Sequence, residues 1–173
     1  MTNSLENFIK EVTMRWSGLN TQTTTGVRKL LMDLAKAPSD EHWLKELHRD
    51  KSPASQLYHD SDHGFMLLAH TEKKGHYRSP HNHGAGWVFY TVQSGALEMN
   101  TYKQITTSKG ITHLVSRGSE IMKAGDCKLF LPGDIHDTKC LSEDFMQFRL
   151  TSSDFKEEIK SGRMTRFINE PQV

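Results

Sequence analysis

Two histidines of this 173-residue chain, His81 and His83, stand one residue apart in a stretch rich in glycine, proline and histidine. Side chains two positions apart on an extended strand point to the same face. Both imidazoles can therefore face the interior of a sheet, with Asn82 turned away. Neutral imidazoles bind first-row transition metals well, but two alone hold such an ion weakly. The alternative is an ordinary pair of surface or hydrogen-bonded histidines.

A third metal ligand can come from later in the chain. Residues 132–136 read Pro-Gly-Asp-Ile-His, so a turn would deliver His136 to the start of a strand. Asp134 suits such a turn, and a carboxylate close to a metal-binding imidazole could also orient it. The sequence therefore predicts a metal site with His81, His83 and His136 as its ligands.

The elements that must position these histidines fall into two groups. Apolar residues recur at helical spacing in three early segments, residues 5–16 (with Ser4 as a cap), 27–34 and 39–51. Short apolar runs between turn residues follow, at residues 65–69, 86–92, 96–102, 113–115, 128–131 and 145–150. Such runs are typical of an antiparallel barrel or a two-sheet sandwich. We expect a helical region, residues 1–52, packed on a β-barrel, residues 53–173, as one structural domain.

Composition narrows the class of protein. The 22 basic residues nearly balance the 21 acidic ones, which argues against a nucleic-acid or membrane-surface protein. Cys127 and Cys140 are too few for a disulfide framework and are expected as buried thiols. We find no secretory signal and no apolar run of ~18 residues. These features favour a cytoplasmic protein whose partner is a small molecule, with no nucleic acid and no membrane.

Glycine spacing sets the histidines in a recognisable pattern. The pattern begins at Gly75, ends at Gly95, and has His81, His83 and Val88 at fixed positions between the two glycines. This pattern resembles the first motif of the cupin superfamily, and residues 132–136 resemble the second. The resemblance implies a mainly β fold, the cupin double-stranded β-helix (a jelly-roll-like barrel) with N-terminal α-helices, and one metal at its mouth.

Within the cupins, residues 58–102 look closest to the cysteine dioxygenase-like thiol dioxygenases. Most cupins place a glutamate where Val88 stands, and the thiol dioxygenases lack it. The resemblance implies an Fe(II) enzyme that oxidises a small thiol with O₂ to a sulfinate, although nickel, manganese and zinc also accept three imidazoles. A homodimer is a further expectation from the superfamily.

Two departures from that family weigh against cysteine itself as the substrate. The family's tyrosine is followed by an arginine that binds the substrate carboxylate, whereas Tyr58 is followed by His59. The family's late Ser-x-His-x-Tyr segment also has no match here. Arg78 and Arg149 could bind a carboxylate instead, since a guanidinium suits that group, or could be solvated at the surface.

Aromatic residues near the histidines are further candidates. Trp87 or Tyr90 could form a pocket wall, or both could belong to the core of the barrel. Tyr102 could reach the mouth of the cavity or lie at an exposed strand end. Tyr90, Tyr102 and Arg78 are our candidate catalytic residues. By strand alternation, Trp87 and Phe89 share the face of the histidines and Tyr90 takes the other face. A bulge at residues 84–86 would reverse that order.

Two other functions stay open. The same barrel serves ring-cleaving dioxygenases, lyases and isomerases, and a fold does not determine the reaction. The chain could also be a non-catalytic cupin that binds a metal or a ligand. Whether O₂ is consumed, and with which substrates, distinguishes these other cupin enzymes from a thiol dioxygenase. Turnover of any substrate would exclude a non-catalytic cupin.

Overall fold

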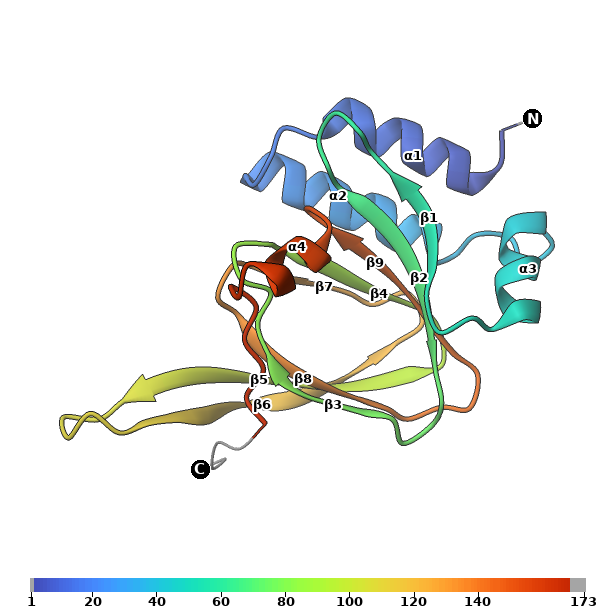
Figure 1. Ribbon diagram of the computed structural model, residues 1–173. Helices are drawn as coiled ribbons and strands as arrows, with labels where there is room; N and C mark the ends of the chain where they lie inside the picture. Colours follow the sequence, from blue (N-terminus) through green and yellow to red (C-terminus); the bar gives the residue numbers. More distant parts are fainter. Residues whose placement is uncertain (1, 169–173) are drawn as a thin grey trace.

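The computed structural model describes residues 2–168 and is mainly β (Figure 1). Within these residues the four helices are α1 Ser4–Arg15, α2 Thr21–Leu34, α3 His42–Asp50 and α4 Phe155–Lys160. The nine strands are β1 Ser55–His59, β2 Met66–Glu72, β3 Tyr77–His81, β4 Val88–Ser94, β5 Ala96–Thr106, β6 Thr112–Lys123, β7 Cys127–Phe130, β8 Ile135–Cys140 and β9 Phe145–Thr151. Within this part of the chain, no helix is both long and apolar enough to cross a membrane.

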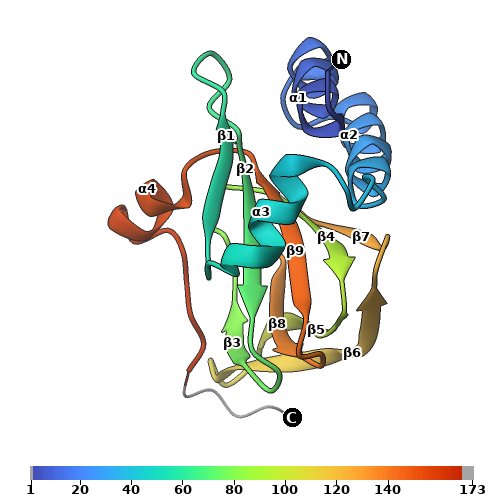
Figure 2. The ribbon, with the colours of Figure 1, turned by 90° about the vertical axis from the view of Figure 1, so that its right-hand side faces the viewer.

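The strands form two antiparallel sheets that enclose a barrel (Figures 1 and 2). The five-stranded sheet has the order β1-β2-β9-β4-β7, and the four-stranded sheet has the order β3-β8-β5-β6. From β2 to β9 the chain passes back and forth between the sheets, with only β5 and β6 consecutive in the same sheet. This winding is the double-stranded β-helix, so the fold class expected from the sequence is confirmed.

The first two helices begin differently from the expectation. Asn3, and not Ser4, caps α1, because its side chain accepts the Glu6 N–H while the Glu6 carboxylate accepts the Asn3 N–H. Helix α2 begins at Thr21, before the expected start at residue 27. It starts there because the Asn20 side chain accepts the N–H of Thr23 at 2.8 Å.

Helices α1 and α2 cover the outer face of the five-stranded sheet (Figure 1). Trp16, the C-cap of α1, stacks on Trp87 with ring centroids 5.0 Å apart and also contacts Phe65. Phe89 and Phe148 point into the same layer and are fully buried. The inner face of this sheet lies against the four-stranded sheet, so both of its faces are removed from water.

The interior of the barrel has an apolar part and a polar part. Ten buried side chains form the apolar cluster, among them Val88, Leu97, Met99, Phe130 and Phe145. The polar side chains of the interior gather around His81. The polar groups therefore lie beside an apolar cluster inside the barrel.

Candidate metal centre

Strands β3 and β8 bring His81 and His136 directly opposite each other. His83 follows two residues after His81, and one ring nitrogen from each of the three histidines lies within 4.8 Å of the others. The Nε2 atoms of His81 and His136 are 3.3 Å apart. Two nitrogens bound to one metal at about 2.1 Å are about 3.0 to 3.4 Å apart. The structure therefore brings together the three histidines that the sequence singled out, at a spacing that suits one ion.

Burial keeps these imidazoles neutral. His81 is 5% exposed, and His83 and His136 are fully buried. Desolvation lowers the pKa of His81 to about 4 and the pKa of His83 to about 2, and it lowers the pKa of His136 well below its usual value. All three rings are neutral at pH 7, which is the form that binds a metal.

The hydrogen bonds of the three rings leave nitrogen lone pairs for an ion. His81 Nδ1 donates to the Ser79 carbonyl at 2.8 Å, so its Nε2 lone pair faces His136. Nδ1 of His83 and Nδ1 of His136 are buried without a hydrogen-bond partner. Among residues 2–168, no carboxylate joins the group. The donor set fits a divalent transition metal bound by three neutral imidazoles.

Aromatic rings enclose the histidines. The Tyr90 hydroxyl lies 3.2 Å from His83 Nε2, and burial raises the pKa of Tyr90, which keeps its phenol protonated. Phe155 stacks on His83 at a centroid distance of 5.1 Å, and Phe130 packs against His136 at 4.0 Å. These rings exclude water from one side of the site.

The expected alternation around the histidines was wrong. Trp87 and Phe89 face the helices, whereas Val88 and Tyr90 face the interior with the histidines. The reason is the turn between β3 and β4, in which the Gly86 N–H donates to the His83 carbonyl. That turn interrupts the two-residue period, which is the reversal that a bulge at residues 84–86 would produce.

A cavity of about 50 Å³ opens beside His81. Three guanidinium groups line it, from Arg78, Arg149 and Arg166, with the carboxylate of Glu72. Glu72 Oε1 accepts from Arg78 Nε at 2.7 Å, and the Glu72 side chain is 3% exposed. The cavity is therefore positively charged and directly adjoins His81.

The structure places two of the three candidate catalytic residues at this cavity. Arg78 and Tyr90 line it, but Tyr102 does not. Thr101 is opposite His136 in the pairing of β5 with β8, so Tyr102 points to the other face of the sheet. There its hydroxyl donates to Asp137 Oδ2 at 2.6 Å, and burial raises its pKa. The expectation that Tyr102 reaches the cavity mouth is corrected accordingly.

Sequence reasoning missed several polar residues of the cavity wall. His70 and Glu72 come from β2, and Gln147 comes from β9. Gln147 lies between Met146 and Phe148, and His70 follows Ala69; these apolar neighbours face the helices. This alternation could have identified these residues from the sequence, because polar side chains on a buried face of a strand normally have hydrogen-bond partners or a functional role.

A C-terminal segment, residues 155–167, covers the histidines from outside. Glu158 accepts the Ala85 N–H at 3.0 Å and forms two hydrogen bonds with Arg163. The Asn82 N–H donates to the Thr165 carbonyl at 3.0 Å, and the Phe167 N–H donates to the Pro80 carbonyl at 2.8 Å. The segment thus runs beside the His81–His83 stretch like an added short strand.

Gly84→Ala should detach this C-terminal segment. Gly84 has φ +61°, and an added Cβ would overlap the Glu158 carboxylate and lie 3.1 Å from the Arg163 backbone. Gly64 is the matched control, because its φ is +80° and a Cβ there meets nothing within 4 Å. We expect Gly64→Ala to cost about 1–2 kcal/mol for backbone strain and Gly84→Ala to cost about 1–3 kcal/mol more for overlap. Urea unfolding measures the costs, and hydrogen exchange at Phe167 should rise only in Gly84→Ala; equal costs with unchanged exchange would contradict this.

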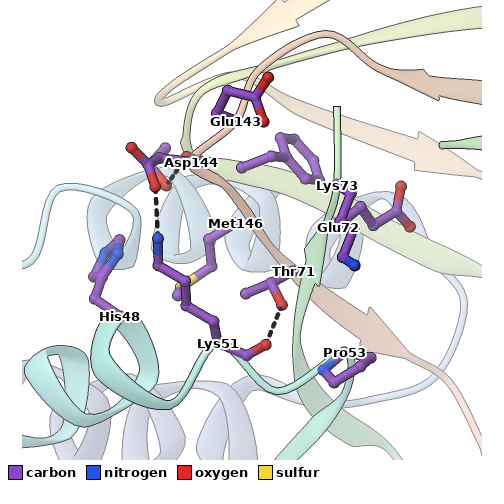
Figure 3. A pocket seen from close by; sticks show the side chains of 11 residues that line it. His48, Lys51, Pro53, Thr71, Glu72, Lys73, Glu143, Asp144 and Met146 are labelled. Carbon is purple, nitrogen blue, oxygen red and sulfur yellow. Dashed lines mark hydrogen bonds and ion pairs between the residues drawn. The ribbon is translucent and has the colours of Figure 1, made fainter. Parts of the chain in front are cut away.

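A second, larger cavity of about 210 Å³ lies between α3 and the ends of β2 and β9 (Figure 3). Its polar groups largely bind one another: Lys51 Nζ donates to Asp144 Oδ1 at 2.7 Å, and Thr71 Oγ1 donates to the Lys51 carbonyl. The Glu72 carboxylate points away from this ion pair (Figure 3). The metal-ligand group among the described residues lies elsewhere, so the smaller cavity is the candidate site.

Comparisons with known proteins show a similarity in fold alone. No family model and no curated protein matches the chain. Solved structures that match include KdgF from Halomonas sp. (17% identity, TM-score 0.45, covering 57% of this chain and 74% of that one). They also include the Cnp3 cupin domain of Schizosaccharomyces pombe (12% identity, TM-score 0.46, covering 67% of this chain and 74% of that one). A third is the DMSP lyase DddQ from Ruegeria pomeroyi (16% identity, TM-score 0.43, covering 61% of this chain and 49% of that one). By its own sheet order, the chain is a cupin-type double-stranded β-helix that holds a three-histidine group able to bind a metal.

Proposed function

We propose that the protein is a metal-dependent enzyme that oxidises a small thiol with O₂, with Fe(II) as its metal. The observation that carries this proposal is the neutral three-histidine group beside a cavity, with no carboxylate in the group among the described residues. Val88 stands where most cupins place a glutamate, and it is buried among apolar side chains. The thiol dioxygenases that the sequence resembles share this arrangement.

A bound divalent ion would supply Lewis acidity and open positions for a substrate. His81, His83 and His136 would hold it without compensating its charge, so an anionic ligand such as a thiolate is favoured. Tyr90 keeps its proton and can donate a hydrogen bond to an anion beside His83. Phe130 and Phe155 exclude bulk water from the same place.

The test is to supply iron during expression, measure the bound metals, and follow O₂ uptake with a panel of small thiols. We expect iron near one per chain and uptake that depends on the thiol and ends in a sulfinate. His83→Ala should lose both properties, whereas His76→Ala, an exposed histidine before β3, should keep them. Bound metal without uptake for any thiol would move the function to another metal-dependent cupin chemistry or to ligand binding. Full activity in His83→Ala would refute the site.

A further inference from the structure

We propose that Phe130 determines how large a molecule can bind the metal, because its ring closes the metal centre off from a second cavity at the edge of the barrel. This inference goes beyond the proposed function, and of that function it needs only a metal bound by the three histidines. Phe130 is thereby a residue that determines specificity. The unmodified protein accepts small ligands of the metal, and loss of the ring admits aromatic ones.

The Phe130 side chain packs against the metal centre. Phe130 is the last residue of β7 and pairs with Val88 of β4, and it faces the interior of the barrel. Its ring centroid is 4.0 Å from that of His136 and 5.8 Å from that of Tyr90. Only 2% of Phe130 is exposed. Phe130 therefore forms one wall of the space around the three histidines.

A cavity of about 190 Å³, which we call the outer cavity, lies against the same side chain. Two further lining residues belong to the surroundings of His136. Thr101 is opposite His136 in the pairing of β5 with β8, and Ile135 directly precedes His136. Phe130 thus contacts the metal centre and lines the outer cavity at the same time.

The outer cavity occupies a gap in the barrel. Among the described strands, β7 is at one edge of the five-stranded sheet and β6 is at one edge of the four-stranded sheet, so no ladder of hydrogen bonds joins them. The lining of the cavity comes from β5, β6, β7 and the start of β8. A side chain closes the interior at this point, and a substitution can open it without breaking a strand pair.

The two cavities differ in what they can hold. The cavity beside His81 has about 50 Å³. One water needs about 10–15 Å³ of such volume, so on the order of four non-hydrogen atoms fit there. The outer cavity has about 190 Å³, whereas about 150 Å³ is enough for benzene. Removal of the Phe130 ring would let an aromatic group on a ligand of the metal enter this larger space.

Contacts on several sides hold the Phe130 ring in place. The Tyr90 ring meets it at an interplanar angle of 80°. Lys128 Nζ lies 5.5 Å from the centre of the ring and is ion-paired with Glu120. His136 packs against it as well. The ring would lose these contacts if it swung aside, so we expect it to act as a fixed barrier.

The outer cavity favours an anionic group on the ligand that enters it. Arg117 lines the cavity, and none of the hydrogen bonds and ion pairs within residues 2–168 involves it. The other charged groups are already engaged: Asp134 accepts the Leu131 N–H at 2.8 Å, and Lys128 is paired with Glu120. A carboxylate at the far end of an aromatic ligand would therefore pair with Arg117, since a guanidinium suits that group.

Ligand binding to the Co(II)-loaded protein tests the inference without turnover, because the visible absorption of this ion changes when a ligand binds it. Azide is the small probe, and 4-phenylimidazole is the large one. We expect the unmodified protein to bind azide and to bind 4-phenylimidazole poorly. Phe130→Ala should bind 4-phenylimidazole about 10- to 100-fold more tightly than the unmodified protein, which corresponds to burial of a phenyl group. Its binding of azide should be nearly unchanged.

Two further variants support this comparison. Phe130→Leu should show a smaller gain in the same direction, and it is included because a buried alanine leaves a cavity that can destabilise the barrel. Phe89→Leu is the matched control, since Phe89 is also buried and lies on the neighbouring strand β4 but faces the helices. It should bind both probes as the unmodified protein does.

A third probe tests the charge of the outer cavity. This probe is 4-phenylimidazole with a carboxylate in the para position of its phenyl ring. In Phe130→Ala or Phe130→Leu the carboxylate should increase the affinity by about 2- to 5-fold, because Arg117 is exposed to solvent. Adding Arg117→Gln should remove this increase. No increase in either Phe130 variant would overturn the role of Arg117.

The outcomes separate this inference from the proposed function. Tight binding of 4-phenylimidazole by the unmodified protein, or no gain in a folded Phe130 variant, would overturn the inference and leave the metal centre and the thiol test intact. An equal gain in Phe89→Leu would also overturn it. The expected size dependence, without O₂ uptake for any thiol, would support the inference and reject the thiol oxidation. A protein that binds no cobalt would refute the metal centre and the inference together.

Discussion

Replacing His136 by alanine should weaken metal binding by more than about 100-fold. Loss of a group that is only hydrogen-bonded to a metal ligand already costs up to about 100-fold in affinity, and this change removes a ligand itself. His136 is fully buried, and its Nε2 faces that of His81 at 3.3 Å. Its removal leaves two ligands, which hold a first-row metal weakly. Competition against a chromophoric chelator, with Co(II) or Zn(II) as the probe ion, measures the change in affinity.

His136→Gln serves as a second variant, because a buried alanine also leaves a cavity that can destabilise the barrel. His113→Ala is the matched control, since His113 lies on β6 away from the metal-ligand group. Circular dichroism verifies that each variant is folded. If a folded His136 variant retained one tightly bound metal per chain, the ion would have to bind elsewhere, and the assignment of this centre would fail.

Acidification should destabilise the metal-free protein strongly as the pH falls below about 6.5. Burial lowers the pKa of His70 to about 3, whereas the unfolded chain protonates it near 6.5. Above that pH both states are neutral and the effect is absent; below it the unfolded state binds the extra proton, so stability falls. His70 alone should cost about 2 kcal/mol between pH 7 and pH 5. The three clustered histidines shift in the same direction and add to the loss.

Urea unfolding of the metal-free protein at several pH values measures this dependence. His70→Gln should reduce the slope by about 1.4 kcal/mol per pH unit between pH 4 and 6. His59→Gln, an exposed histidine at the end of β1, should leave the slope unchanged. A stability that stays constant from pH 7 to pH 5 would mean that the histidines are solvated and that the interior is more open than its burial indicates.

The fold and the histidine group could be predicted because both depend on local patterns. Glycines such as Gly95, with φ +77°, fix the turns that set the motif spacing. A turn between β7 and β8 delivers His136, in which the Leu131 N–H donates to Asp134. The apolar faces of the predicted helices must also be buried against a sheet. These signals are short-range, so the sequence contains them without knowledge of the sheet order.

The rest of the site depends on strand register, which the sequence does not display. Tyr102 was expected at the cavity, but its opposition to Ile135 turns it outward. Arg149 could equally have been solvated, and only the neighbouring position of β9 and β4 sets it beside Tyr90. A register shift of one residue would exchange the faces of either strand. Such pairings between distant segments are decided by the whole core.

The C-terminal segment also has a consequence for how the protein is made. Synthesis runs from the N-terminus, so the ribosome completes all three histidines before it adds the residues that lie beside His81 and Asn82. The two sheets that hold the three histidines are complete with β9, so the C-terminal segment is the last part of the site to be synthesised.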